Sequence, residues 1–134
     1  MPNKLYPEKP ILIVDDEEFW LVSLQMLLAK RGKISHVLTC SDSSQVMSML
    51  AEQEFSLVLL DYLMPEVSGD ELLKQIVPLY PQLPVAIITG NDQEEMAEYC
   101  MALGACNYFV KTLEGENLTV AIREILQLQE NKRN

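Results

Sequence analysis

The chain has 134 residues, of which 49% are hydrophobic and 22% are charged, and its formal net charge is −10. This length and mixture fit one globular domain that buries its own core, and they exclude a disordered chain or a membrane-spanning one. The negative charge opposes direct binding to nucleic acid. The three cysteines show no metal-ligand spacing and no apolar signal stretch opens the chain, so we expect a reduced, cytoplasmic protein.

Apolar runs alternate with helical repeats along the whole chain. The apolar runs predict strands over residues 11–14, 34–39, 55–60, 85–88 and 106–110. The helical spacing of apolar residues predicts helices over residues 17–31, from 41 or 42, over 70–78 and 92–103, and from 114 onward. Strict alternation of strand and helix predicts a parallel sheet that is covered on both faces.

The expected fold class is therefore α/β, a doubly wound five-stranded parallel sheet with five helices and the flavodoxin-like strand order 2-1-3-4-5. We assign residues 10–128 to this domain, residues 1–9 to an extension, and residues 129–134 to a polar tail or the start of a linker. In this order the first and third strands are neighbours, and ligands bind beyond their carboxyl ends.

Acidic side chains follow both of these strands. Asp15 and Asp16 come directly after the first strand, and Asp61 comes directly after the third. Converging carboxylates repel one another unless a cation neutralises them, and Mg2+ with phosphate oxygens is the usual remedy. The alternative is structural, because aspartate after a strand also forms turns and caps helices. Capping explains one side chain for each helix and leaves one of the paired aspartates without a role.

Four separated motifs resemble the receiver domain of two-component response regulators, and the resemblance runs from about residue 10 to residue 128. In chain order the motifs are Val14-Asp15-Asp16-Glu17, Leu60-Asp61-Tyr62-Leu63-Met64-Pro65 with Gly69, Ile88-Thr89-Gly90, and Gly104-Ala105 through Tyr108 to Lys111. The resemblance implies a signalling switch that is not an enzyme beyond its own phosphorylation and autodephosphorylation.

The resemblance also implies the roles of the strand-end residues. Asp61 would accept a phosphoryl group from the phosphohistidine of a sensor histidine kinase or a histidine phosphotransfer protein. Asp16, Asp61 and the backbone carbonyl of Leu63 would hold Mg2+, or Mn2+ in its place, and Asp15 would act through water and by holding Lys111. Lys111 would share with the metal the charge that develops on the phosphoryl oxygens.

A switch and an output are implied in the same way. Thr89 would reach a phosphoryl oxygen, and Tyr108 would swing into the space that Thr89 vacates. Their movement would reshape the face made by the fourth helix, the fifth strand and the fifth helix, which would signal to an output domain or a downstream protein. The chain would be either a stand-alone receiver or the first part of a longer regulator, and it would form a weak homodimer that phosphorylation strengthens.

A second apolar stripe, Phe19, Val22 and Met26, is offset from the core stripe of the first helix. It predicts either a docking surface for the phosphodonor partner or simply a wide buried face.

One position departs from the family's pattern, and two others bear on the lifetime of the phosphoryl group. Thr112 stands where the family usually has proline, so the Lys111–Thr112 bond is either strained or trans, since a cis bond there costs about 2.5–4 kcal/mol. Leu63 lies two residues beyond Asp61, and Asn91 lies two residues beyond Thr89. The apolar Leu63 offers no polar group that could align a hydrolytic water, so we expect slow autodephosphorylation.

Two other classes of function fit parts of the pattern. A haloacid-dehalogenase-like phosphatase also uses a strand-end aspartate with Mg2+, but its Asp-x-Asp arrangement is missing at Asp61-Tyr62-Leu63. A flavodoxin-like cofactor carrier would need a loop rich in Ser, Thr or Gly after the first strand, where this chain has acid.

Overall fold

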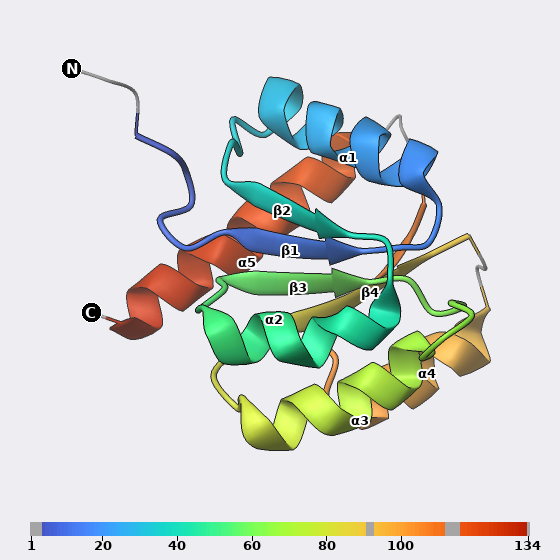
Figure 1. Cartoon of the computed structure of the whole chain (residues 1–134). Helices are drawn as coiled ribbons and strands as arrows, with labels where there is room; N and C mark the ends of the chain where they lie inside the picture. Colours follow the sequence, from blue (N-terminus) through green and yellow to red (C-terminus); the bar gives the residue numbers. More distant parts are fainter. Residues whose placement is uncertain (1–3, 91–92, 112–115, 134) are drawn as a thin grey trace.

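The computed structural model describes residues 4–90, 93–111 and 116–133 (Figure 1). Its strands are β1 (Ile11–Val14), β2 (Val37–Cys40), β3 (Leu57–Leu60), β4 (Val85–Thr89) and β5 (Asn107–Val110). Its helices are α1 (Glu18–Arg31), α2 (Val46–Glu52), α3 (Gly69–Leu79), α4 (Glu94–Ala102) and α5 (Glu116–Arg133), with a short 3-10 turn (Ser43–Gln45) before α2.

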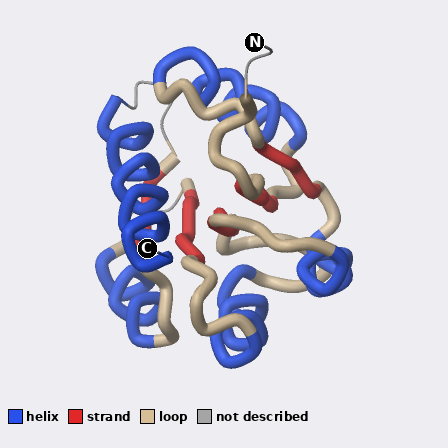
Figure 2. Tube along the Cα trace, turned by 90° about the vertical axis from the view of Figure 1, so that its left-hand side faces the viewer, coloured by secondary structure: helices blue, strands red, loops and turns tan. Residues whose placement is uncertain are grey.

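The strands form one parallel sheet in the order β2-β1-β3-β4-β5, as the alternating pattern predicted. Ile11 of β1 pairs with Val37 of β2 on one side and with Leu57 of β3 on the other. β1 and β3 are therefore neighbours in the middle of the sheet. Figure 2, seen from the side of the strands' amino ends, shows helices on both sides of the sheet.

Each face of the sheet has its own apolar core. Ile11 and Ile13 of β1 point to the first core, which packs under α1 and α5, whereas Leu12 and Val14 point to the second, which packs under α2, α3 and α4. All four β1 side chains are completely buried. Burial on both faces explains why the strand is an unbroken apolar run instead of an alternating one.

The second strand begins three residues later than the sequence pattern predicted. The backbone amides of Ser35 and His36 both donate to the carbonyl of Tyr6, so the N-terminal segment takes the donors that were expected to pair with β1. The Tyr6 ring also lies under the guanidinium of Arg123 on α5, 5.1 Å away. A local apolar pattern could not reveal this long-range contact.

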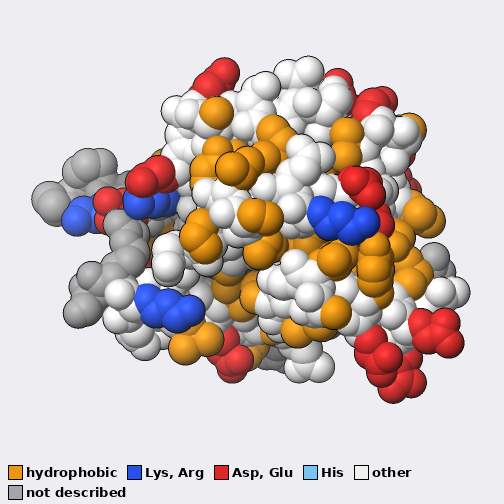
Figure 3. All heavy atoms as spheres, turned by 90° about the horizontal axis from the view of Figure 1, so that it is seen from below, with side chains coloured by type: hydrophobic (Ala, Val, Ile, Leu, Met, Phe, Trp, Pro, Cys, Tyr) orange, Lys and Arg blue, Asp and Glu red, His pale blue; other side chains and the backbone are white. Residues whose placement is uncertain are grey.

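Among the described residues, no helix combines the length and apolar character needed to cross a bilayer. On the face shown in Figure 3, Lys and Arg side chains lie apart from one another and do not form a continuous basic patch.

Candidate functional site

The backbone of the site continues the hydrogen bonding of the sheet one residue beyond the strands. The Asp15 amide donates to Cys40 O (3.1 Å), the Asp61 amide donates to Val14 O (3.0 Å), and the Lys111 amide donates to Thr89 O (2.8 Å). Side chains from three chain segments are therefore fixed at the carboxyl edge of the sheet.

Three carboxylates meet at this edge. Asp15, Asp16 and Asp61 each offer an oxygen, and these oxygens lie within 4.8 Å of one another. Asp15 is completely buried, Asp61 is 5% exposed, and Asp16 faces solvent. The structure thus brings together the acidic residues that follow the first and third predicted strands, and their oxygens form a donor set that suits a hard divalent cation.

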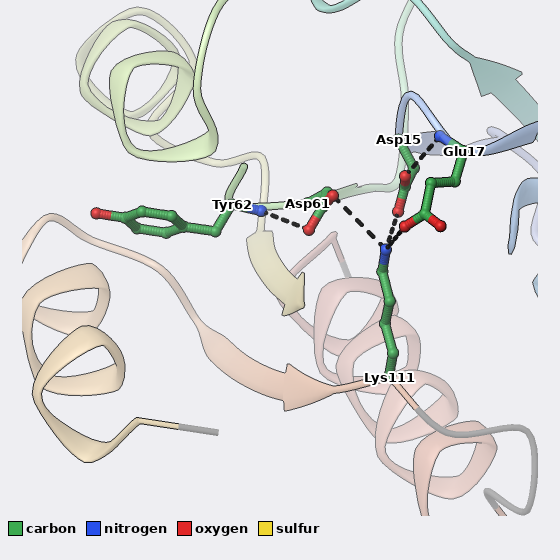
Figure 4. A network of polar contacts seen from close by, with 5 residues as sticks. All are labelled: Asp15, Glu17, Asp61, Tyr62 and Lys111. Atoms are coloured by element: carbon green, nitrogen blue, oxygen red, sulfur yellow. Dashed lines mark hydrogen bonds and ion pairs between the residues drawn. The ribbon is translucent and has the colours of Figure 1, made fainter. Parts of the chain in front are cut away.

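The ammonium of Lys111 lies among these acids (Figure 4). Its Nζ is 2.7 Å from Asp15 Oδ2, 3.1 Å from Glu17 Oε1 and 3.6 Å from Asp61 Oδ2. It also lies 5.4 Å from the centre of the Trp20 ring. The sequence had marked Lys111 as a counter-charge, but the contacts with Glu17 and Trp20 were not anticipated. The only sequence signal for Glu17 was its place directly after the acidic pair.

The charges of the site are only partly balanced. Burial and the nearby Asp15 charge raise the pKa of Asp61 to about 6, against the opposing effects of Lys111 and of the Tyr62 amide. Burial also raises the pKa of Asp15, although the Lys111 ammonium and the Glu17 amide oppose the rise. Burial alone would lower the pKa of Lys111, but its hydrogen bonds to Asp15 and Glu17 raise it above the ordinary value. One lysine thus leaves a surplus of negative charge, which a bound cation would neutralise.

The remaining predicted residues lie around this centre. Thr89 ends β4 and is 2% exposed, while Tyr108 on β5 pairs in register with Ile87 and packs against the second core. The side chain of Leu63, in the loop after β3, is 61% exposed. The expectations that concern Asn91 and Thr112 lie outside the described residues.

The second apolar stripe of α1 points to solvent. Phe19 is 79% exposed, Val22 57% and Met26 51%, whereas Trp20, Leu24 and Leu27 form the buried stripe. The alternative of a wide buried face is therefore wrong, and α1 carries an exposed apolar surface.

The family model of the response regulator receiver domain matches residues 11–123 of the chain. The chain belongs to this family. The receiver is 36% identical over 116 residues to the transcriptional regulatory protein ZraR of Escherichia coli (strain K12), covering 87% of this chain and 26% of ZraR. It is 30% identical over 122 residues to the alkaline phosphatase synthesis transcriptional regulatory protein PhoP of Bacillus subtilis (strain 168), covering 91% of this chain and 50% of PhoP.

Among solved structures, a CheY-like receiver domain protein from Methanospirillum hungatei JF-1 superposes on this receiver with a TM-score of 0.82. The two are 29% identical, and the match covers 92% of this chain and 98% of the other. The receiver spans about a quarter of ZraR and half of PhoP. As a receiver it is a signalling domain of two-component systems, with the flavodoxin-like fold that the sequence predicted.

Proposed function

We propose that Asp61 accepts a phosphoryl group from the phosphohistidine of a sensor histidine kinase or a histidine phosphotransfer protein. The observation that supports this most is the meeting of Asp61 with two other carboxylates and the Lys111 ammonium at the end of β3. A carboxylate oxygen of Asp61 attacks phosphorus, the phosphorus–nitrogen bond breaks, and the imidazole leaves with the electron pair and takes a proton from solvent. Lys111 draws the phosphoryl oxygens toward its ammonium.

The acidic residues suit Mg2+, with Mn2+ as the alternative ion. In this proposal Asp16, Asp61 and the backbone carbonyl of Leu63 hold the ion, and Asp15 acts through water while it holds Lys111. When bound, the ion supplies positive charge that offsets the charge on the phosphoryl oxygens. The support is the surplus of carboxylate over lysine in the cluster. Burial, and after it the charge of Asp15, raises the pKa of Asp61.

The switch is proposed to run through Thr89 and Tyr108. The Thr89 hydroxyl binds the phosphoryl group, Tyr108 moves inward behind it, and the face made by α4, β5 and α5 changes shape. This face then binds an output domain or a downstream protein, or a second copy in a weak dimer. ZraR and PhoP, named as transcriptional regulatory proteins, are longer than the stretch that matches this chain, which supports an attached output domain as one arrangement beside a stand-alone receiver.

Phe19, Val22 and Met26 are proposed to dock the phosphodonor partner. They are exposed, they lie on one stripe of α1, and the helix begins three residues after Asp15. In this proposal the partner is a cytoplasmic protein, and the segment contacts neither nucleic acid nor membrane.

Phosphorylation is tested by intact mass after incubation with acetyl phosphate and Mg2+. We expect one phosphoryl adduct on the parent, none on Asp61→Asn, and none when a chelator removes Mg2+. Glu18→Gln, which removes an exposed acid from the first turn of α1, serves as the control and should carry the adduct. If the parent carries no adduct, or if Asp61→Asn carries one, the proposed function is wrong.

The adduct is expected to hydrolyse slowly. The Leu63 side chain stands two residues beyond Asp61 with 61% of its surface exposed, and it has no group that could orient an attacking water. We expect Leu63→Gln to shorten the lifetime by about tenfold, which corresponds to 1.36 kcal/mol in the barrier. The time course of adduct loss after donor removal measures the effect, with Leu63→Met as the control. A parent lifetime of only seconds would contradict the expectation.

A further inference from the structure

Lys111 has more anionic partners than the proposed transfer requires. An ammonium has three N–H donors, and in this structure three carboxylates surround it. Two of these, Asp15 and Asp61, are buried, whereas the Glu17 side chain is 67% exposed. Even so, Nζ lies closer to Glu17 (3.1 Å) than to Asp61 (3.6 Å). The ammonium is therefore held nearer to a surface residue than to the proposed phosphoacceptor.

The backbone of Glu17 is held in place from two sides. Its amide donates to Asp15 Oδ1 (2.9 Å), and its carbonyl accepts from the Leu21 amide (3.2 Å) as the N-cap position of α1. The side chain thus reaches Lys111 from a fixed base, and the contact joins residues 94 positions apart. Figure 4 shows Glu17 and Asp61 approaching the ammonium from different segments.

Trp20, one turn further along α1, completes the surroundings of Lys111. Its ring lies 5.4 Å from Nζ, a distance typical of a cation–π contact, and the residue is 7% exposed. Within the described part of the chain the indole N–H has no hydrogen-bond partner. The ammonium lies over the face of the ring and is not bound by the indole N–H. Trp20 is also the chain's single tryptophan, so its emission reports on the ammonium beside it.

We propose that Glu17 is a positioning residue that holds the Lys111 ammonium at the mouth of the site and must release it before Lys111 can bind a phosphoryl group on Asp61. This inference rests on the proposed function. Glu17 then slows phosphorylation, because its contact with Lys111 must break each time a phosphoryl group is transferred to Asp61. Because an exposed ion pair contributes little free energy, we expect its effect on the rate of phosphorylation to be small.

Three variants separate contact from charge. Glu17→Gln removes the charge and the ion pair. Glu17→Asp keeps the charge but is one methylene shorter, so it loses the 3.1 Å contact. Glu18→Gln removes an equal charge from the neighbouring position, which faces solvent and has no ion pair with Lys111.

The affinity of each variant for trifluoroberyllate, a phosphoryl mimic, is measured at saturating Mg2+ by Trp20 emission, and the rate with acetyl phosphate by intact mass. We expect Glu17→Gln and Glu17→Asp to raise both by about two- to fivefold, and Glu18→Gln to leave both unchanged. If Glu17→Asp behaves as the parent, charge at a distance acts instead of contact, and the proposal is wrong. Unchanged or lower values for Glu17→Gln overturn it as well.

A second readout needs neither metal nor phosphodonor. In buffer alone, Trp20 emission should differ from the parent in Glu17→Gln and Glu17→Asp, because the ammonium moves relative to the ring, and it should match the parent in Glu18→Gln. Identical emission in all four proteins overturns the positioning role. A parent that takes up neither phosphoryl group nor trifluoroberyllate would instead refute the proposed function, so the two failures are distinguishable.

Discussion

Gly69→Ala is expected to lower the free energy of unfolding by about 3 kcal/mol, the upper range for an overpacked site. A Cβ on Gly69 would lie 2.3 Å from the carbonyl oxygen of Asp61 and 2.9 Å from Cα of Tyr62. Both are backbone atoms, and the Gly69 amide donates to the Tyr62 carbonyl at 2.8 Å, so α3 cannot withdraw without losing this bond. Urea unfolding followed by circular dichroism measures the loss.

Gly90→Ala is the matched control. Apart from its chain neighbours, no heavy atom of the described residues would lie within 4 Å of a Cβ there, so we expect a change within about 0.5 kcal/mol. If the two variants were equally stable, the first turn of α3 would have to move freely over the Asp61 peptide, contrary to the packing described above.

Asp61→Asn is expected to stabilise the metal-free protein by on the order of 2 kcal/mol at pH 8, allowing for solvent screening at the edge of the sheet. Burial and the charge of Asp15 raise the pKa of Asp61 from 3.8 to about 6, so the folded state opposes ionisation of this group. Asparagine has no charge to bury, and it can still accept the hydrogen bond that the Tyr62 amide donates to Asp61 Oδ1.

The pH dependence gives the sign of this effect. Between pH 3.8 and about 6 the folded protein binds the Asp61 proton more tightly than the unfolded chain does, so stability falls as pH rises through this window. The advantage of Asp61→Asn should therefore be complete at pH 8 and smaller at pH 5. Urea unfolding at both pH values, with Glu18→Gln as the control, checks it. An equal or lower stability of Asp61→Asn at pH 8 would contradict the expectation.

The fold was predictable because it depends on patterns that lie within single segments. β1 is an apolar run because Leu12 and Val14 lie in the second core while Ile11 and Ile13 lie in the first. The predicted start of β2 was wrong, because the amides of Ser35 and His36 donate to the Tyr6 carbonyl. A periodic pattern within one segment does not encode such a long-range contact.

The acidic cluster was also predictable, since Asp15 and Asp61 each follow a recognisable strand and parallel strands end at one edge. The Glu17–Lys111 pair was not, because the motif gives Glu17 no role and an acidic residue at the start of a helix also fits an ordinary surface site. Helical spacing identified the core stripe of α1, but it left open whether Phe19 is exposed, because apolar residues occupy most of the circumference of the helix.

The hydrogen bonds that carry the sheet past its strand ends also set how the site can fluctuate. The amides of Asp15, Asp61 and Lys111 continue the hydrogen bonding between the core strands. Their hydrogen exchange should therefore require opening of the sheet and should be nearly as slow as exchange in β1 and β3. A site anchored in this way cannot loosen by fraying, so we expect any conformational change that follows the proposed phosphorylation to begin in side chains and in the loops beyond these hydrogen bonds.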